Sequence, residues 1–94
     1  MSALEKYYQG DDHWRRFAET FSANWERCNF KNELLVALCG HEDLAKVVFA
    51  AVGDSALTWI NNPIPALDGL SPQECLRSEV LLKRLQVMLA RFPF

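Results

Sequence analysis

The sequence lacks any apolar run of the roughly 18 to 20 residues that a membrane-spanning helix needs. Its start, MSALEKYYQGDD, does not resemble a secretion signal, because no apolar stretch follows the lysine. Half of the 94 residues are nevertheless hydrophobic, which is too apolar for a disordered chain. We therefore expect a single folded domain over residues 1–94, located in the cytoplasm and without membrane contact.

An excess of positive charge is also missing. Ten basic residues stand against twelve acidic ones, which gives a formal net charge of −2. Domains that bind nucleic acid usually carry a clustered basic surface. The charge balance therefore disfavours nucleic acid as the main partner.

Cysteine is scarce and shows no paired motif. Cys28, Cys39 and Cys75 are widely spaced and form no Cys-x-x-Cys pair, so a disulfide framework is not expected. Together with His13 and His41 they match none of the usual zinc spacings. We expect ordinary buried or half-buried cysteine side chains and no metal.

Catalytic motifs are absent as well. The sequence has no Gly-rich phosphate loop, no H-E-x-x-H motif and no nucleophile elbow. The acidic pairs at 11–12 and 42–43 stand at predicted helix starts, where capping and the helix dipole explain them. The sequence therefore favours binding over catalysis, and we expect neither an enzyme nor a cofactor.

Strand signals are missing, and apolar residues recur at helical spacing instead. We expect helices at 12–27, 31–39 and 42–52, and a fourth that Asp54 caps and that carries Trp59 and Ile60. The first of these places four aromatic residues on one core-facing side: Trp14, Phe17, Phe21 and Trp25. The predicted fold class is all-α, a small compact bundle of about five to six helices.

The segment after Trp59 is the least helical part of the sequence, yet it is rich in apolar residues. Pro63 and Pro65 disfavour helix, and Asp68-Gly69 predicts a turn in which glycine takes a positive φ. We expect this loop to be ordered, with its apolar side chains docked on neighbouring helices: Ile64, Leu67 and Leu70.

A capping box follows the loop. Ser71 is suited to cap, Pro72 fits the first helical position, and Glu74 stands three residues after the cap. We expect one last helix up to Arg91, or a pair of helices broken near Ser78.

Residues 91–94 are Arg91-Phe92-Pro93-Phe94. Two interpretations of the phenylalanines stay open. They fold back on the domain, or they enter the pocket of a partner protein.

The run from Trp59 to Glu74, WINNPIPALDGLSPQE, resembles the toxin-binding domain of the Xre/MbcA/ParS antitoxin family. Members of that family carry a Trp-Leu, a proline soon after it, a Leu-x-Gly, and a Ser/Thr-Pro that opens the next helix. The resemblance is strongest over about 56–76 and extends more faintly over 47–94. The residues that occupy the motif positions are Trp59, Pro63, Leu67, Gly69, Ser71 and Pro72.

The resemblance implies a small helical module that forms a homodimer and binds a RES-domain toxin. Such toxins consume NAD or transfer ADP-ribose from it, and the C-terminal part of the antitoxin obstructs access to their active site. The implied function is therefore a non-enzymatic inhibitor without a DNA-binding domain of its own. The motif residues would build the scaffold, whereas the toxin contacts would be Arg91, Phe92 and Phe94, supported by Met88 and Arg84.

Two alternatives remain beside this hypothesis. The chain is a dimeric DNA-binding regulator whose N-terminal helices bind an operator, or it is a general adaptor that uses the same scaffold.

Overall fold

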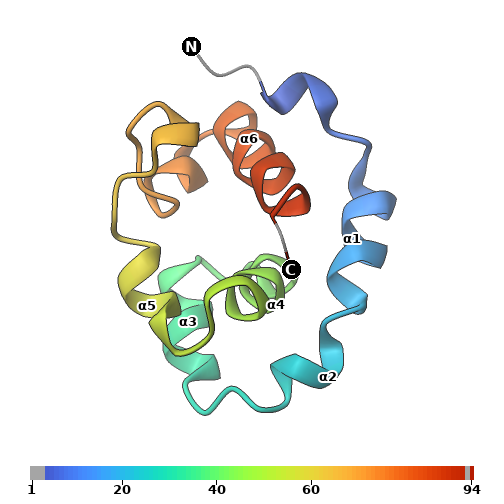
Figure 1. Cartoon of the computed structure of the whole chain (residues 1–94), viewed down its shortest axis with the longest axis vertical. Helices are drawn as coiled ribbons and strands as arrows, with labels where there is room; N and C mark the ends of the chain where they lie inside the picture. Colours follow the sequence, from blue (N-terminus) through green and yellow to red (C-terminus); the bar gives the residue numbers. More distant parts are fainter. Residues whose placement is uncertain (1–3, 93) are drawn as a thin grey trace.

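The computed structural model describes residues 4–92 and 94, which form helices and turns without a strand among them. The all-α prediction is thereby confirmed (Figure 1). None of the helices in these residues has the length and apolarity of a membrane-spanning helix. In chain order the elements are the 3₁₀ helix η1 (Leu4–Tyr7), α1 (Asp11–Glu19), α2 (Ser22–Trp25), α3 (Lys31–Ala37), α4 (Glu42–Val52), η2 (Gly53–Ser55), α5 (Ala56–Trp59), η3 (Pro65–Leu67), η4 (Glu74–Arg77) and α6 (Glu79–Ala90).

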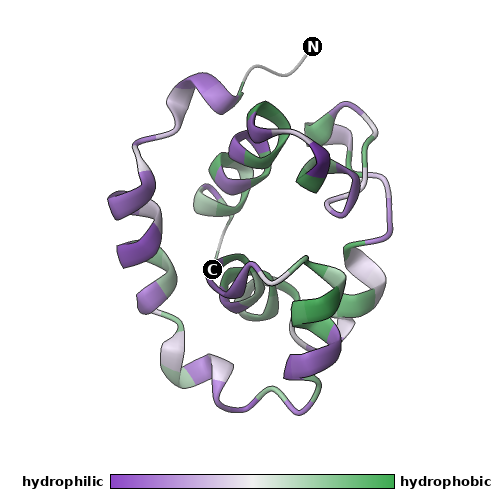
Figure 2. Cartoon of the chain, turned by 180° about the vertical axis from the view of Figure 1, so that it is seen from behind, coloured by the Kyte–Doolittle hydropathy of each residue, from purple (hydrophilic) through white to green (hydrophobic). Residues whose placement is uncertain are grey.

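The helix α4 contributes most to the core. It begins and ends at the predicted residues, and Leu44, Val47 and Val48 on its inner face are at most 1% exposed. Helices α1 and α2 pack on one side of α4, and α3 and α5 on another (Figure 1). In contrast to the buried apolar face of α4, α1 is mostly hydrophilic, as Figure 2 shows, because one side of it faces solvent. The radius of gyration, 12.2 Å, is that of a compact chain of this length.

The prediction of one continuous helix over 12–27 is wrong. Thr20 and Phe21 separate α1 from α2, and their amides donate to carbonyls only three residues back. The Thr20 hydroxyl also donates to the Phe17 carbonyl at 2.6 Å. A threonine side chain that bonds to the backbone competes with the helical ladder, and the chain turns at this point.

The aromatic residues nevertheless enter the core as predicted. Trp14 and Trp25 are 7% and 5% exposed, and Phe17 and Phe21 pack partly buried against them. Trp25 meets Phe49 of α4 edge to face, with ring centroids 6.3 Å apart. The turn therefore changes the direction of the backbone and keeps the apolar side.

Three other expectations need correction. The helix predicted at 31–39 ends at Ala37, because Cys39 (φ 56°) and Gly40 (φ 82°) take left-handed conformations. This turn leaves Cys39 exposed, contrary to the expectation of a buried or half-buried thiol, whereas Cys28 and Cys75 are buried. The fourth helix begins later than predicted, since η2 contains Asp54 and no side chain caps α5.

Residues 60–71, the larger part of the connection between α5 and η4 and here called the proline loop, are ordered as predicted. The amides of Ile64 and Gly69 donate to the carbonyls of Leu70 and Ile64 at 3.0 and 3.1 Å. Asp68 (φ 57°) and Gly69 (φ 84°) form the left-handed turn. Leu67 is fully buried, and Ile64 and Leu70 pack against the core. The proline loop is therefore a hydrogen-bonded part of the core.

The reciprocal hydrogen bonds of the predicted capping box are present, but the helix does not begin at Pro72 as expected, since Pro72 and Gln73 form a turn and η4 begins at Glu74. The Ser71 amide donates to Glu74 Oε1 at 2.9 Å, and the Glu74 amide donates to Ser71 Oγ at 3.2 Å. The segment that follows is short, because the backbone of Ser78 is extended and its hydroxyl accepts from the Leu81 amide at the start of α6. The C-terminal region is thus a pair of helices broken at Ser78.

The capping box predicts a pH dependence. The hydrogen bonds from Ser71 to the charged Glu74 carboxylate lower the pKa of this group below its ordinary value of 4.5. The unfolded chain therefore binds the proton first on acidification, and the stabilisation, complete above about pH 4.5, is lost as the pH falls through the lower folded-state pKa. We expect the melting temperature of Glu74→Gln to fall less than that of the wild type between about pH 5 and pH 3. Equal slopes in the two proteins, with Glu19→Gln as an exposed control, would contradict this role of Glu74.

Candidate functional site

An open apolar groove lies between the proline loop and the end of α6. Its volume is about 560 Å³, and its walls come from η1, from the end of α5 with the proline loop, and from the last turn of α6. The residues that line it are Leu4, Trp59, Ile64, Pro65, Ala66, Met88, Arg91 and Phe92. Seven of these side chains are apolar, and Arg91 is the one charged group among these described residues.

The proline loop holds one wall of the groove in place. Trp59 ends α5 and is half-buried, while Ile60 beside it is fully buried and accepts from the Gln73 amide at 3.0 Å. In η3, Leu67 points into the core and the preceding Ala66 is exposed. The wall is therefore fixed from behind by buried leucine and isoleucine side chains.

The end of α6 forms the opposite wall. Met88 lies in the last turn of α6 and Phe92 follows the end of the helix, and both are partly buried against the core. The Arg91 guanidinium lies over the Tyr7 ring, 4.6 Å from its centroid. This contact joins the end of α6 to η1.

Three of the five residues predicted as toxin contacts line this groove, namely Met88, Arg91 and Phe92. Phe94 does not line it. Its ring lies 4.7 Å from Phe21 and 5.8 Å from Phe17, where α1 turns into α2, and it remains 53% exposed. In this structure both phenylalanines contact the domain, and both alternatives of the sequence analysis stay predictions.

Arg84 has an internal role. Its Nε donates to Glu5 Oε1 and its Nη1 to Asp68 Oδ2, both at 2.9 Å, and its side chain is 13% exposed. The hydrogen bond from Arg84 lowers the pKa of Glu5, and the same bond raises that of Arg84. The guanidinium thus ties η1 and the proline loop to α6, so we assign Arg84 to the support of the groove rather than to partner contact.

Sequence reasoning missed part of the groove. Trp59 was expected to be part of the scaffold, yet it also forms a wall of the groove. Leu4 and Ala66 line the groove as well, and neither was predicted to contact a partner. Leu4 meets α6 across more than eighty residues of chain, and no local pattern indicates such a contact. Ala66 had a weak signal, since it precedes a buried leucine in a loop whose prolines fix the backbone.

The side chains that could carry other chemistry are dispersed. Within residues 4–92 and 94, no three His, Cys, Asp or Glu side chains gather where they could hold a metal ion. His13 and His41 are exposed near the starts of α1 and α4. The groove itself offers apolar contact and one guanidinium, which suits an apolar segment of another polypeptide with an acidic group nearby.

No protein-family model, curated protein or solved structure shows significant similarity to this chain. Support for a function therefore comes from the sequence motif and from the geometry of this chain.

Proposed function

We propose that this chain is an antitoxin-type protein-binding module that binds a RES-type toxin through the apolar groove and inhibits it without catalysis. One observation carries the proposal. The groove joins Trp59 of the family-like motif to Met88, Arg91 and Phe92, the residues at and just after the end of α6 that were expected to contact the toxin.

The composition of the groove supports a protein partner. Aromatic and arginine side chains are over-represented among residues that dominate binding energy at interfaces, and the groove contains Trp59, Phe92 and Arg91. An apolar side chain of the toxin would lie between Trp59 and Phe92. An acidic group beside it would accept from the guanidinium.

The stiffness of the wall supports binding as well. The loop hydrogen bonds and the buried Leu67 hold the groove in shape before a partner arrives, so little conformational entropy is lost on association. Inhibition then needs no chemistry of this chain. The bound module covers the entrance of the toxin's active site and keeps NAD out.

The test uses the purified chain and a purified RES-domain protein. We expect binding at micromolar concentration or below by calorimetry, inhibition of NAD consumption in proportion to the complex formed, and a dimer of this chain by sedimentation. A RES-domain protein that neither binds nor loses activity at tens of micromolar would contradict the toxin as partner. Tight, strongly salt-dependent binding to duplex DNA would instead favour the regulator alternative.

A further inference from the structure

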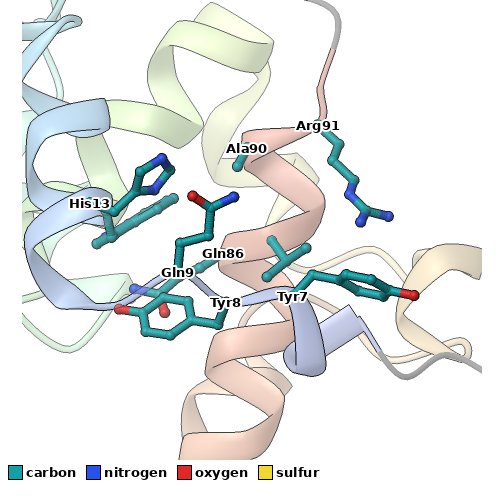
Figure 3. Close-up of a pocket in the computed structure, with 9 residues that line it drawn as sticks. Tyr7, Tyr8, Gln9, His13, Gln86, Ala90 and Arg91 are labelled. Atoms are coloured by element: carbon teal, nitrogen blue, oxygen red, sulfur yellow. The ribbon is translucent and has the colours of Figure 1, made fainter.

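The 3₁₀ helix η1 (Leu4–Tyr7) lies along α6, yet none of its four described residues is buried. Leu4 lines the open apolar groove instead of the core. A pocket of about 250 Å³ separates the end of η1 from α6, with Tyr7 and Tyr8 on one side and Ala90 on the other (Figure 3). Helix η1 is therefore attached less tightly than the elements whose side chains fill the core.

The side-chain contacts that hold η1 involve cations. Arg84 Nε donates to Glu5 Oε1 at 2.9 Å, and the Arg91 guanidinium lies 4.6 Å from the centroid of the Tyr7 ring (Figure 3). Tyr7 is 60% exposed, so the second contact lies in solvent. Attractions of this kind weaken as salt is added, because the Debye length falls from about 10 Å at 0.1 M to about 3 Å at 1 M.

Arg84 keeps a second partner when η1 leaves. Its Nη1 donates to Asp68 Oδ2 at 2.9 Å, so the loss of Glu5 does not strand the guanidinium without a counter-charge. A half-buried cation that lost every partner would strongly oppose the release of η1. The contact with Asp68 removes this obstacle.

Tyr8 marks the point at which the chain becomes firmly attached. Its side chain packs partly buried against the core, and its hydroxyl donates to Asp11 Oδ1 at 2.6 Å. Residues 4–7 can therefore move without disturbing α1. The Tyr8 amide donates to the Glu5 carbonyl at 3.2 Å, so hydrogen exchange at this amide reports whether η1 is in place.

We propose that η1 is a salt-sensitive strap that closes one wall of the apolar groove. In the closed state Leu4 lines the groove. Release of the strap takes this side chain away and lowers the affinity for the partner. The effect on affinity rests on the proposed function, whereas the opening of the strap is a property of this chain alone.

Hydrogen exchange of the Tyr8 amide, followed by NMR, tests the opening. At about 50 mM salt we expect the amide to exchange at least about fivefold faster in Glu5→Gln than in the wild type, because the strap loses its ion pair. The ratio of the two rates should approach one at about 1 M salt, where the ion pair of the wild type is screened. A ratio near one at low salt, or the same ratio at both salt concentrations, overturns the proposal.

Two controls accompany this measurement. Glu19→Gln removes an exposed carboxylate on α1 and should leave the exchange at Tyr8 unchanged. The Ala45 amide, which donates to the His41 carbonyl at the start of α4, should exchange at the same rate in all three proteins. Equal acceleration at Ala45 and Tyr8 in Glu5→Gln would show a general loss of stability and would also overturn the strap.

Calorimetry with the RES-domain protein tests the link to the groove. Tyr7→Ala removes the ring beneath Arg91 and, like Glu5→Gln, should weaken binding at least about fivefold, whereas Tyr7→Phe keeps the ring and should stay within about twofold of the wild type. If the wild type binds and both strap variants bind equally well, the strap does not control the groove. If the wild type itself does not bind, the proposed function fails, and the exchange rates still decide whether the strap opens.

Discussion

Replacement of Leu67 by alanine is expected to lower the free energy of unfolding by about 2–5 kcal/mol, because it leaves a cavity beneath the proline loop. Leu67 is fully buried although it lies in a loop, it belongs to the hydrophobic core, and its element η3 contacts α6. At roughly 4–8 °C per kcal/mol for a domain of this size, the melting temperature should fall by at least about 8 °C. Thermal and urea unfolding followed by circular dichroism measure both quantities.

Val80→Ala is the matched control for this truncation. Val80 is 51% exposed on α6, so the loss of its methyl groups should change the stability by less than about 0.5 kcal/mol. If Leu67→Ala were no more destabilising than Val80→Ala, the loop would be a loose connection, and the rigid wall of the groove would have no support.

The substitution Ala66→Glu should reduce the affinity for the proposed RES-domain partner about 100-fold, which corresponds to roughly 2.7 kcal/mol. Ala66 is exposed on the apolar groove, so the new carboxylate has water around it in the free protein and loses this water when a partner covers it. It would also compete with the toxin for Arg91. Calorimetry with the RES-domain protein gives the affinity, and circular dichroism checks that the fold is kept.

Val36→Glu provides the same change of charge away from the groove. Val36 is 79% exposed on α3 and does not line the groove, and its substitution should leave the affinity within about twofold. Equal losses in the two variants would point to a general effect of charge. Full affinity in Ala66→Glu would place the toxin on another face.

Local chemistry explains what the sequence predicted well. The bounds of α4 followed from its acidic start, its apolar periodicity and the glycine after it. The proline loop followed from residues whose backbone preferences need no tertiary contact, namely two prolines, Asp68-Gly69 and the Ser71 cap. These features are decided within a few residues of chain, so a single sequence contains them.

Two causes explain the features that the sequence did not predict: side chains that compete for backbone hydrogen bonds, and contacts between residues far apart in the chain. The aromatic periodicity continues across Thr20, so it gave no sign that a single hydroxyl would break the helix. Arg84 looked like a solvent-exposed cation near the end of the chain, because its partners Glu5 and Asp68 are 79 and 16 residues away. The groove wall at Leu4 has the same cause, since it depends on which segments meet in space.

The bridge between Glu5 and Arg84 also sets an order of events during folding. Joining positions so far apart requires closure of nearly the whole chain, and the entropy of that closure grows with its length. Such a contact forms after the local helices and turns have formed. The groove, which needs Leu4 beside α6, therefore exists only in the fully assembled domain, so an incomplete chain emerging from the ribosome would not yet present the proposed binding surface.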